Sequence, residues 1–280
     1  MTFTTTVQQN GHNSNAAQAI AKDEFDAREF ESRRDPLPYL QMLNAQDPEQ
    51  AGFFITSDNR EAVNFTPTDE WTPHTTQFQN GETVAGDRSL TARFLILRKS
   101  KLLMFNRDSG DFTGVYQKSQ YDRNTVVLKT RYLVYIVSKN KQLLHESPLV
   151  LTTKGSLCGS FGEAVRKFHN DMSKAYGAAT GARKPRGDRF MALSILAVRV
   201  QPEWKGSGKK SWACSVVDYG TPTVENWRSY FVGYDAALKE RLLAEFNDWP
   251  DFGNPELEAQ PSQIRPAEES NYNDDGYEEF

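Results

Sequence analysis

Lysine and arginine are concentrated in one stretch of this sequence, and tyrosine, phenylalanine and tryptophan are interspersed among them. Residues 88–210 contain 24 Lys and Arg against 8 Asp and Glu, a net charge of +16. Cationic side chains along a groove neutralise phosphates and release counterions, while aromatic faces stack on unpaired bases for about 1–3 kcal/mol each. This combination favours the binding of a single nucleic-acid strand, with DNA favoured over RNA.

Two kinds of residue are expected to contact such a strand. The residues expected to hold phosphates are Arg93, Lys99, Lys101, Lys129, Arg131, Arg183, Lys184, Arg186, Arg189, Lys209 and Lys210. The residues expected to stack on bases are Tyr121, Tyr135 and Trp204. Along one predicted strand, a period of two places Lys129, Arg131 and Tyr135 on the same face, which we expect to be exposed and cationic.

Patterns typical of catalysis and metal binding are weak in comparison. The four His share no ligand spacing, and Cys158 and Cys214 lie far apart in the sequence and are expected to be reduced thiols. We therefore expect no cofactor, no metal and no enzymatic activity. A metal-dependent nucleic-acid enzyme stays open as an alternative, and it requires carboxylates to gather around Mg²⁺. Its candidate carboxylates are Asp108, Asp111, Asp122 and Glu146.

The basic segment has two further interpretations. It can be an ordinary solvated surface that the acidic segments balance, or it can bind an acidic protein. The second interpretation describes an accessory or structural protein of a phage or mobile element. Formation of a homo-oligomer also stays open.

Length and charge distribution indicate the organisation of the chain. With 280 residues, 38% of them hydrophobic, the chain can bury a sizeable core. Its net charge of −4 hides a strong asymmetry, because residues 1–87, 211–250 and 251–280 carry −9, −3 and −8. We expect a disordered or partly helical lead at 1–35, one globular domain at 36–250 and a disordered acidic tail at 251–280. The absence of an apolar segment near Met1, and of any run long enough to span a membrane, predicts a cytoplasmic protein.

The elements that position these residues are mainly strands. Apolar and aromatic runs separated by turn residues predict strands at 91–105, 112–118, 125–137, 143–152, 190–200 and 211–217. A capping box of Ser160 with Glu163 and a helical repeat of apolar residues predict an amphipathic helix that ends at Gly177. A second helix is predicted at 235–246, and residues 36–87 are expected to pack around the fold or to supply extra strands.

The order of these elements resembles the OB-fold, in which a helix lies between the third and fourth strands of a small antiparallel barrel. The resemblance implies a mainly β (α+β), OB-like barrel that commonly binds single strands. Four strands precede the helix in this sequence, so one of them must be an addition to the barrel.

The C-terminal residues carry a second resemblance. Asp274-Asp275-Gly276-Tyr277-Glu278-Glu279-Phe280 is similar to the acidic tails of bacterial and phage single-stranded DNA-binding proteins, which end in Phe. The Ile-Pro that precedes the final Phe in the bacterial form is absent here. The resemblance implies that Asp274, Asp275, Tyr277, Glu278, Glu279 and Phe280 dock replication, recombination or repair proteins and that the tail competes with DNA for the basic groove.

Overall fold

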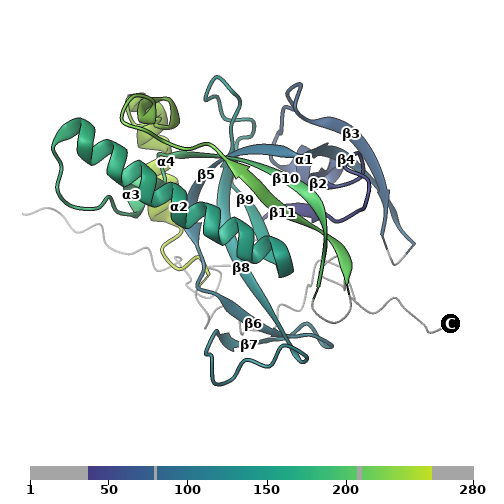
Figure 1. Ribbon diagram of the computed structural model, residues 1–280. Helices are drawn as coiled ribbons and strands as arrows, with labels where there is room; N and C mark the ends of the chain where they lie inside the picture. Colours follow the sequence, from purple (N-terminus) through teal and green to yellow (C-terminus); the bar gives the residue numbers. More distant parts are fainter. Residues whose placement is uncertain (1–36, 79–80, 207–209, 254–280) are drawn as a thin grey trace, which may run out of the picture. The chain divides into compact units, whose positions relative to one another are not determined.

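One mixed sheet of eleven strands organises residues 37–78, 81–206 and 210–253, which are the residues that the computed structural model describes (Figure 1). The strands are β1 (Tyr39–Leu43), β2 (Gly52–Thr56), β3 (Thr72–Gln77), β4 (Thr83–Ser89), β5 (Thr91–Lys99), β6 (Leu103–Asn106), β7 (Phe112–Val115), β8 (Val126–Ile136), β9 (Leu149–Lys154), β10 (Ile195–Lys205) and β11 (Ser211–Tyr219). The helices are α1 (Ser57–Ala62), α2 (Gly155–Thr180), α3 (Asp188–Met191), the 3-10 turn η2 (Trp227–Tyr230) and α4 (Ala236–Asp248). The lead at 1–35, which we expect to be disordered or partly helical, lies outside the described residues.

The strand order shows that the fold is mainly β, as predicted, and that the sheet is open. The order is β11-β10-β5-β8-β9-β1-β2-β4-β3, with β6 paired to β8 and β7 paired to β6. All the pairs are antiparallel except β1 with β9, which are parallel. Because β11 and β3 end the sheet without pairing to each other, the topology differs from the closed barrel that we expected.

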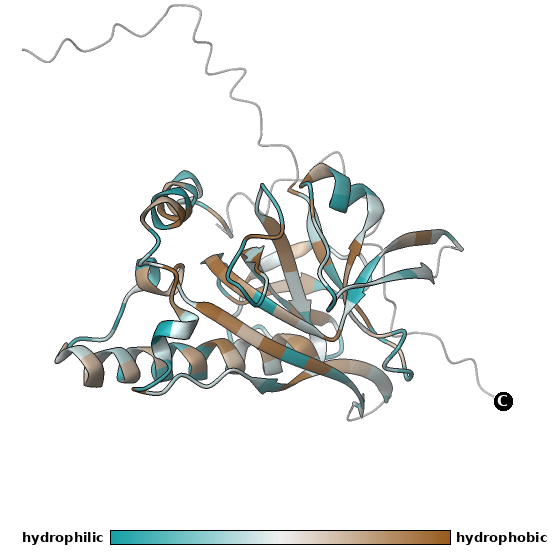
Figure 2. Cartoon of the chain, turned by 90° about the horizontal axis from the view of Figure 1, so that it is seen from above, coloured by the Kyte–Doolittle hydropathy of each residue, from teal (hydrophilic) through white to brown (hydrophobic). Residues whose placement is uncertain are grey.

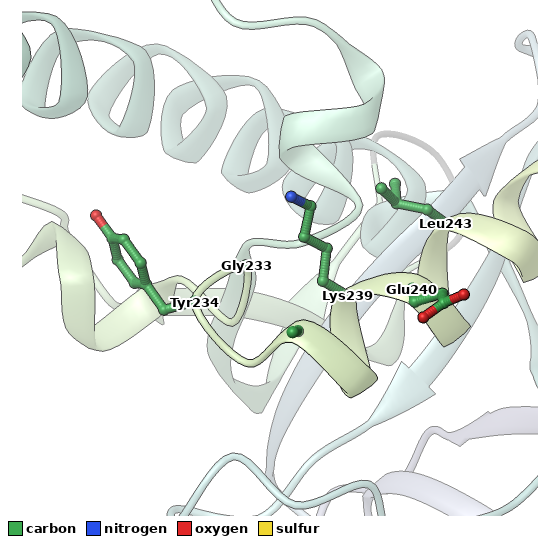
Figure 3. A pocket seen from close by; sticks show the side chains of 6 residues that line it. Gly233, Tyr234, Lys239, Glu240 and Leu243 are labelled. Carbon is green, nitrogen blue, oxygen red and sulfur yellow. The ribbon is translucent and has the colours of Figure 1, made fainter.

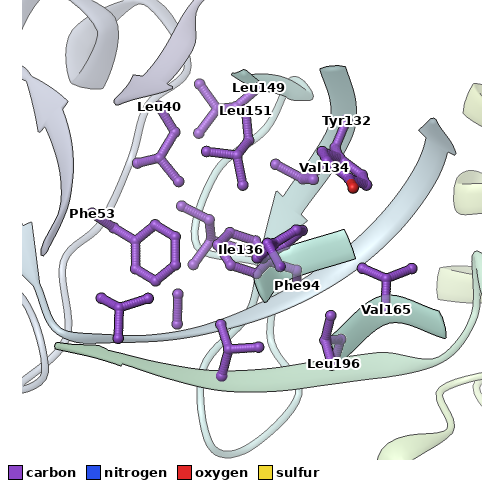
Figure 4. Close-up of a cluster of buried hydrophobic side chains, with 14 of the residues drawn as sticks. Leu40, Phe53, Phe94, Tyr132, Val134, Ile136, Leu149, Leu151, Val165 and Leu196 are labelled. Carbon is purple, nitrogen blue, oxygen red and sulfur yellow. The ribbon is translucent and has the colours of Figure 1, made fainter. Parts of the chain in front are cut away.

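The sheet curls around the main core. The ring centroids of Phe53 on β2 and Phe94 on β5 are 5.2 Å apart, although β8, β9 and β1 separate these two strands in the sheet. Only Leu90 separates β4 from β5, so the chain passes from one part of the sheet to the other at a single residue. Figure 4 shows the side chains of Leu40, Phe53 and Phe94 converging with their neighbours in this core.

Helix α2 closes one side of this core with an apolar stripe. Leu157, Phe161, Val165 and Phe168 are buried at helical spacing, and the helix ends at Gly181, whose φ of 74° suits a residue without Cβ. The predicted capping box is wrong, because the helix begins five residues before Ser160. The hydroxyl of Ser160 donates instead to Ser156 O and accepts from the Val216 backbone N–H of β11.

The opposite face of β5 and β8 lies under α4. Leu133 and Tyr135 of β8 pack with Leu242 and Phe246 of α4 in a second core. Figure 2 shows the contrast in hydropathy between the mainly brown central strands and the more hydrophilic connecting loops. Because α4 covers only part of this face, the position of a residue along β8 determines whether its side chain is exposed to solvent.

Several predicted boundaries shift in the structure. The predicted strand at 91–105 is broken into β5 and β6, and the strand at 143–152 begins only at Leu149, after an isolated bridge between Leu143 and Val137. Residues 36–87 supply β1 to β3 and most of β4, so of the two alternatives expected for this segment the structure shows the addition of strands. Asp235 caps α4 by accepting a hydrogen bond from Leu238 N, close to the predicted start of that helix.

Candidate nucleic-acid interface

Two backbone contacts bring Lys101, which follows β5, beside an arginine of β8. Ser100 N donates to Arg131 O at 2.8 Å, and Arg131 N donates to Ser100 Oγ at 2.9 Å. Lys99 and Lys101 flank the buried Ser100, and both side chains are exposed. Lys101 and Arg131 therefore lie close together. Lys99 pairs with Tyr132, and its ammonium lies 5.8 Å from the centroid of the Tyr132 ring, so its side chain projects from the face opposite to Arg131.

The pairing of β8 with its neighbours adds two more lysines. Lys129 lies directly opposite Lys154 in the antiparallel pair of β8 and β9, so both side chains project from the same face. The Lys129 ammonium is 4.2 Å from the centroid of the Phe105 ring on β6, a cation–π contact that holds the lysine stem against the sheet. We refer to Lys101, Lys129, Arg131 and Lys154 as the cationic strip.

The loop between α2 and α3, together with the start of α3, gathers a second group of cations. Arg183, Lys184 and Arg186 lie in the loop, and Arg189 lies in α3. The Arg186 guanidinium donates to Lys184 O and lies 5.0 Å from the centroid of the Tyr176 ring on α2. The Arg186 backbone N–H also donates to Ser173 Oγ. Residues 184–190 and Phe246 line a shallow cavity of about 640 Å³. We call this group the basic loop.

Arg98 connects the basic loop to the cationic strip, although the sequence analysis did not select it. Its Nε donates to Phe246 O at 2.9 Å, and its guanidinium lies 3.5 Å from the centroid of the Phe246 ring. Phe246 also lines the cavity of the basic loop, and Arg98 pairs with Leu133, which is two residues from Arg131 of the strip on the same face of β8. The contact joins residues 148 positions apart in sequence, so no local pattern could have shown it.

Two of the predicted ligands lie elsewhere. Arg93 forms an ion pair with Glu70, so its charge is engaged within the fold. The expectation that Tyr135 lies on an exposed face is wrong, because its side chain is 0% exposed under α4 and stacks on His145 with ring centroids 5.0 Å apart. The alternation along β8 was correct, but α4 covers this part of the face.

The remaining aromatic candidates are on loops and a hairpin. Tyr121 lies in the loop before β8 and contacts Tyr116 edge to face, with ring centroids 5.7 Å apart. Trp204 is 49% exposed near the tip of the β10–β11 hairpin, where Lys210 is also exposed. Lys209 lies outside the described residues, as do the six tail residues predicted to dock partners.

Burial controls the ionisation of the groups under α4. Burial raises the pKa of Tyr135 to about 12, and it lowers the pKa of His145 to about 4. His145 accepts a hydrogen bond from Ile136 N through Nε2, and its Nδ1 lies 2.6 Å from Ser147 O, which it reaches as a donor when the ring is neutral. These groups are structural parts of the core.

The four carboxylates of the enzyme alternative do not assemble. Among residues 37–78, 81–206 and 210–253, no three His, Cys, Asp or Glu side chains are grouped so that they could hold a metal ion. Asp122 instead stabilises its own turn by accepting from Asn124 N, and Glu146 accepts from the Asn64 side chain. The geometry that a Mg²⁺ site requires is thus absent from the described part of the chain.

A second hollow of about 270 Å³ lies at the start of α4, where Gly233, Tyr234, Ala236, Lys239, Glu240 and Leu243 line it (Figure 3). One lysine and one glutamate contribute to this lining, so it lacks the positive charge of the basic loop.

None of the helices in the described residues is long and apolar enough to cross a membrane.

Comparisons with known proteins place the chain in a family. The family described as "Domain of unknown function (DUF5895)" matches residues 34–265. "Uncharacterized protein 254L" of Invertebrate iridescent virus 6 is 25% identical over 180 residues, which cover 59% of this chain. The match covers 54% of the viral protein, so the chain spans about half the length of this relative. No solved structure matches the chain.

Proposed function

We propose that this chain, which belongs to the DUF5895 family, binds single-stranded DNA along the cationic strip and the basic loop, without catalysis. The proposal rests on the residues of the chain itself. The observation that carries the proposal is the convergence of cations from distant parts of the sequence. The segment after β5, the first half of β8, the end of β9 and the α2–α3 loop contribute to one connected region. Such a surface favours the binding of a nucleic-acid strand, because each phosphate that it neutralises releases counterions.

The route of the strands supports an OB-like architecture as a finer part of the proposal. Pairings lead from β5 through β8, β9, β1 and β2 to β4, and the chain returns from β4 to β5 through Leu90. β4, Leu90 and β5 together form one long bent segment of strand. Such a segment lets a small sheet wrap around a single core. Helix α2 directly follows β9 and covers the core, as the helix of an OB-fold follows its third strand.

The acidic tail belongs to the same proposal because of where the described chain ends. Gly253 packs so tightly on Ser100 that a Cβ at position 253 would lie 2.4 Å from Ser100 Cβ. Lys99 and Lys101 are the neighbours of Ser100, so the chain leaves the fold beside the cationic strip. Residues 251–280 carry a net charge of −8, and their tethering gives a high effective concentration of competing anion.

The end of the tail has a second role in the proposal. Asp274, Asp275, Tyr277, Glu278, Glu279 and Phe280 dock proteins of DNA replication, recombination or repair. A strand that occupies the cationic strip displaces the tail and makes these residues available to partners. Binding of DNA and binding of partners then support each other.

The test is a titration of the full chain into a fluorescein-labelled oligonucleotide of 20 thymidines, followed by anisotropy. We expect binding that weakens linearly with the logarithm of salt concentration, by about 0.7 logarithmic unit for each neutralised phosphate. A duplex of equal length and an oligouridine are the comparisons, and both should bind more weakly. Absence of salt-sensitive binding to the thymidine strand at 50 mM salt would contradict the proposal, and tighter binding of oligouridine would reassign it to RNA.

A further inference from the structure

The β10–β11 hairpin carries a pair of tryptophans beyond the body of the sheet. Pairing of β10 with β5 ends at Arg199 and Thr91, so residues 200–205 and their partners on β11 continue as a two-stranded ribbon. Near its tip Trp204 lies directly opposite Trp212, with ring centroids 5.4 Å apart. The sequence analysis missed Trp212, although a hairpin centred on Gly208 places positions 204 and 212 opposite each other.

The ribbon is anchored beside the cationic strip. The Cys214 backbone N–H donates to Asn44 Oδ1, and the hydroxyls of Ser215 and Ser156 lie 2.9 Å apart. Ser156 is two residues after Lys154 of the strip, in the first turn of α2. Trp212 is three residues before Ser215, about 10 Å along an extended strand. A single strand that contacts Lys154 can therefore reach the tryptophan pair.

One ring of this cross-strand pair is largely exposed. A cross-strand aromatic pair stabilises its hairpin by about 0.2–1 kcal/mol, and that role is fulfilled best when both rings are covered. Trp204 instead leaves 49% of its surface in water, and Lys210 is exposed after the turn. Lys205, before the turn, is also exposed and forms an ion pair with Glu203. An indole face next to ammonium groups offers both interactions that an unpaired nucleotide can make.

We infer that Trp204 and Trp212 form a stacking platform for bases of a strand whose phosphates lie on the cationic strip. The inference rests on the proposed function and extends it to a defined hairpin. The ribbon presents the indoles, Asn44 and Ser156 fix its base, and the lysines of the turn attract the neighbouring phosphates. Stacking of this kind tolerates any base sequence, because every base has a π-face.

The experiment combines anisotropy of the labelled thymidine strand with intrinsic tryptophan fluorescence. Trp204→Ala should weaken binding from about fivefold to about 150-fold, which corresponds to the loss of one stacked base. The double variant Trp204→Phe with Trp212→Phe keeps aromatic faces, so it should bind within a fewfold of the wild type while losing most of the quenching. Three tryptophans remain in it. Trp71 and Trp227, 5% and 1% exposed, are a background that the strand cannot reach, and the half-buried Trp249 after α4 is the source of any quenching that this variant keeps.

Tyr234→Ala is the matched control, because Tyr234 is a 65% exposed aromatic residue at the start of α4 and should leave affinity unchanged. The inference is overturned if Trp204→Ala binds like Tyr234→Ala and the double variant keeps the wild-type quenching. It is also overturned if phosphatidylserine vesicles, and not the oligonucleotide, quench the wild-type tryptophans. Failure of the proposed function is distinguishable, because the wild-type anisotropy would then stay flat before any variant is measured.

Discussion

Strand β8 shows two regions of one face with different roles. Lys129 and Arg131 project from the first half of this face and belong to the cationic strip, whereas Leu133 and Tyr135 project from the second half and are buried under α4. The four residues are spaced two apart, so the geometry of the strand places all four side chains on the same face. The difference shows that strand periodicity assigns a side chain to a face, and that a distant helix decides whether the face meets a ligand.

The largest expected effect concerns the covered half and is on stability. Tyr135→Ala should lower the free energy of unfolding by about 3–5 kcal/mol, because it empties a fully buried aromatic site. Lys101→Ala, in the exposed half, should change it by less than about 0.5 kcal/mol. Urea unfolding followed by circular dichroism measures both values, and a change below about 1 kcal/mol for Tyr135→Ala would remove the distinction between the halves.

The second effect tests the same buried region through pH. Burial holds the pKa of His145 at about 4, below the value of 6.5 expected for the unfolded chain. The unfolded state therefore binds a proton that the folded state excludes, and the free energy of unfolding should fall by roughly 3 kcal/mol as the pH drops from 6.5 to 4. Histidine NMR gives the His145 titration directly, and a midpoint near 6.5 would show that α4 does not seal this region.

The third effect concerns the exposed half and is on binding. The double variant Lys101→Glu with Lys154→Glu should lower the affinity for the thymidine strand by roughly 100-fold at 50 mM salt. It should also reduce the slope of the logarithm of affinity against the logarithm of salt concentration by about 1.4, for two lost phosphate contacts. Lys139→Glu with Lys239→Glu makes the same change in net charge, but Lys139 lies beyond the far end of β8 and Lys239 lies on α4. Equal losses in the two double variants would mean that total charge, and not the strip, determines affinity.

The smallest effect comes from the tail. Removal of residues 268–280 should raise affinity about tenfold at 50 mM salt and less at 200 mM, because screening weakens the competition between tail and strand. A full-length variant with the tail acids changed to Asn and Gln should reproduce this gain. If both variants bind like the wild type, the tail does not occupy the strip.

Local signals were sufficient to predict many of these elements. The amphipathic helix α2, the start of α4 at Asp235 and the β-rich middle of the chain follow from apolar spacing and turn residues. The basic loop was also predictable, since its four cations are close in sequence. These features depend on residues that are neighbours along the chain.

Other features depend on contacts that the sequence does not display. Arg98 contacts Phe246 across 148 positions, and burial of Tyr135 requires α4, which begins 101 residues later. The open sheet arises because β1 to β4 join the strands of the basic segment. β1 to β4 are short, so the sequence of residues 36–87 predicted only that this segment packs around the fold or adds strands. Trp212 is the exception, since the register of its hairpin could have been predicted.

Lysine reactivity in the presence of the thymidine strand tests the central claim most directly. Acylation of the whole chain with a small reagent, quantified by mass spectrometry, reports every lysine in one sample of unmodified sequence. We expect the strand to protect Lys101 and Lys154 several-fold, while Lys139 and Lys239 react as in the free protein. Protection of Lys139 and Lys239 with no change at Lys101 and Lys154 would contradict the claim.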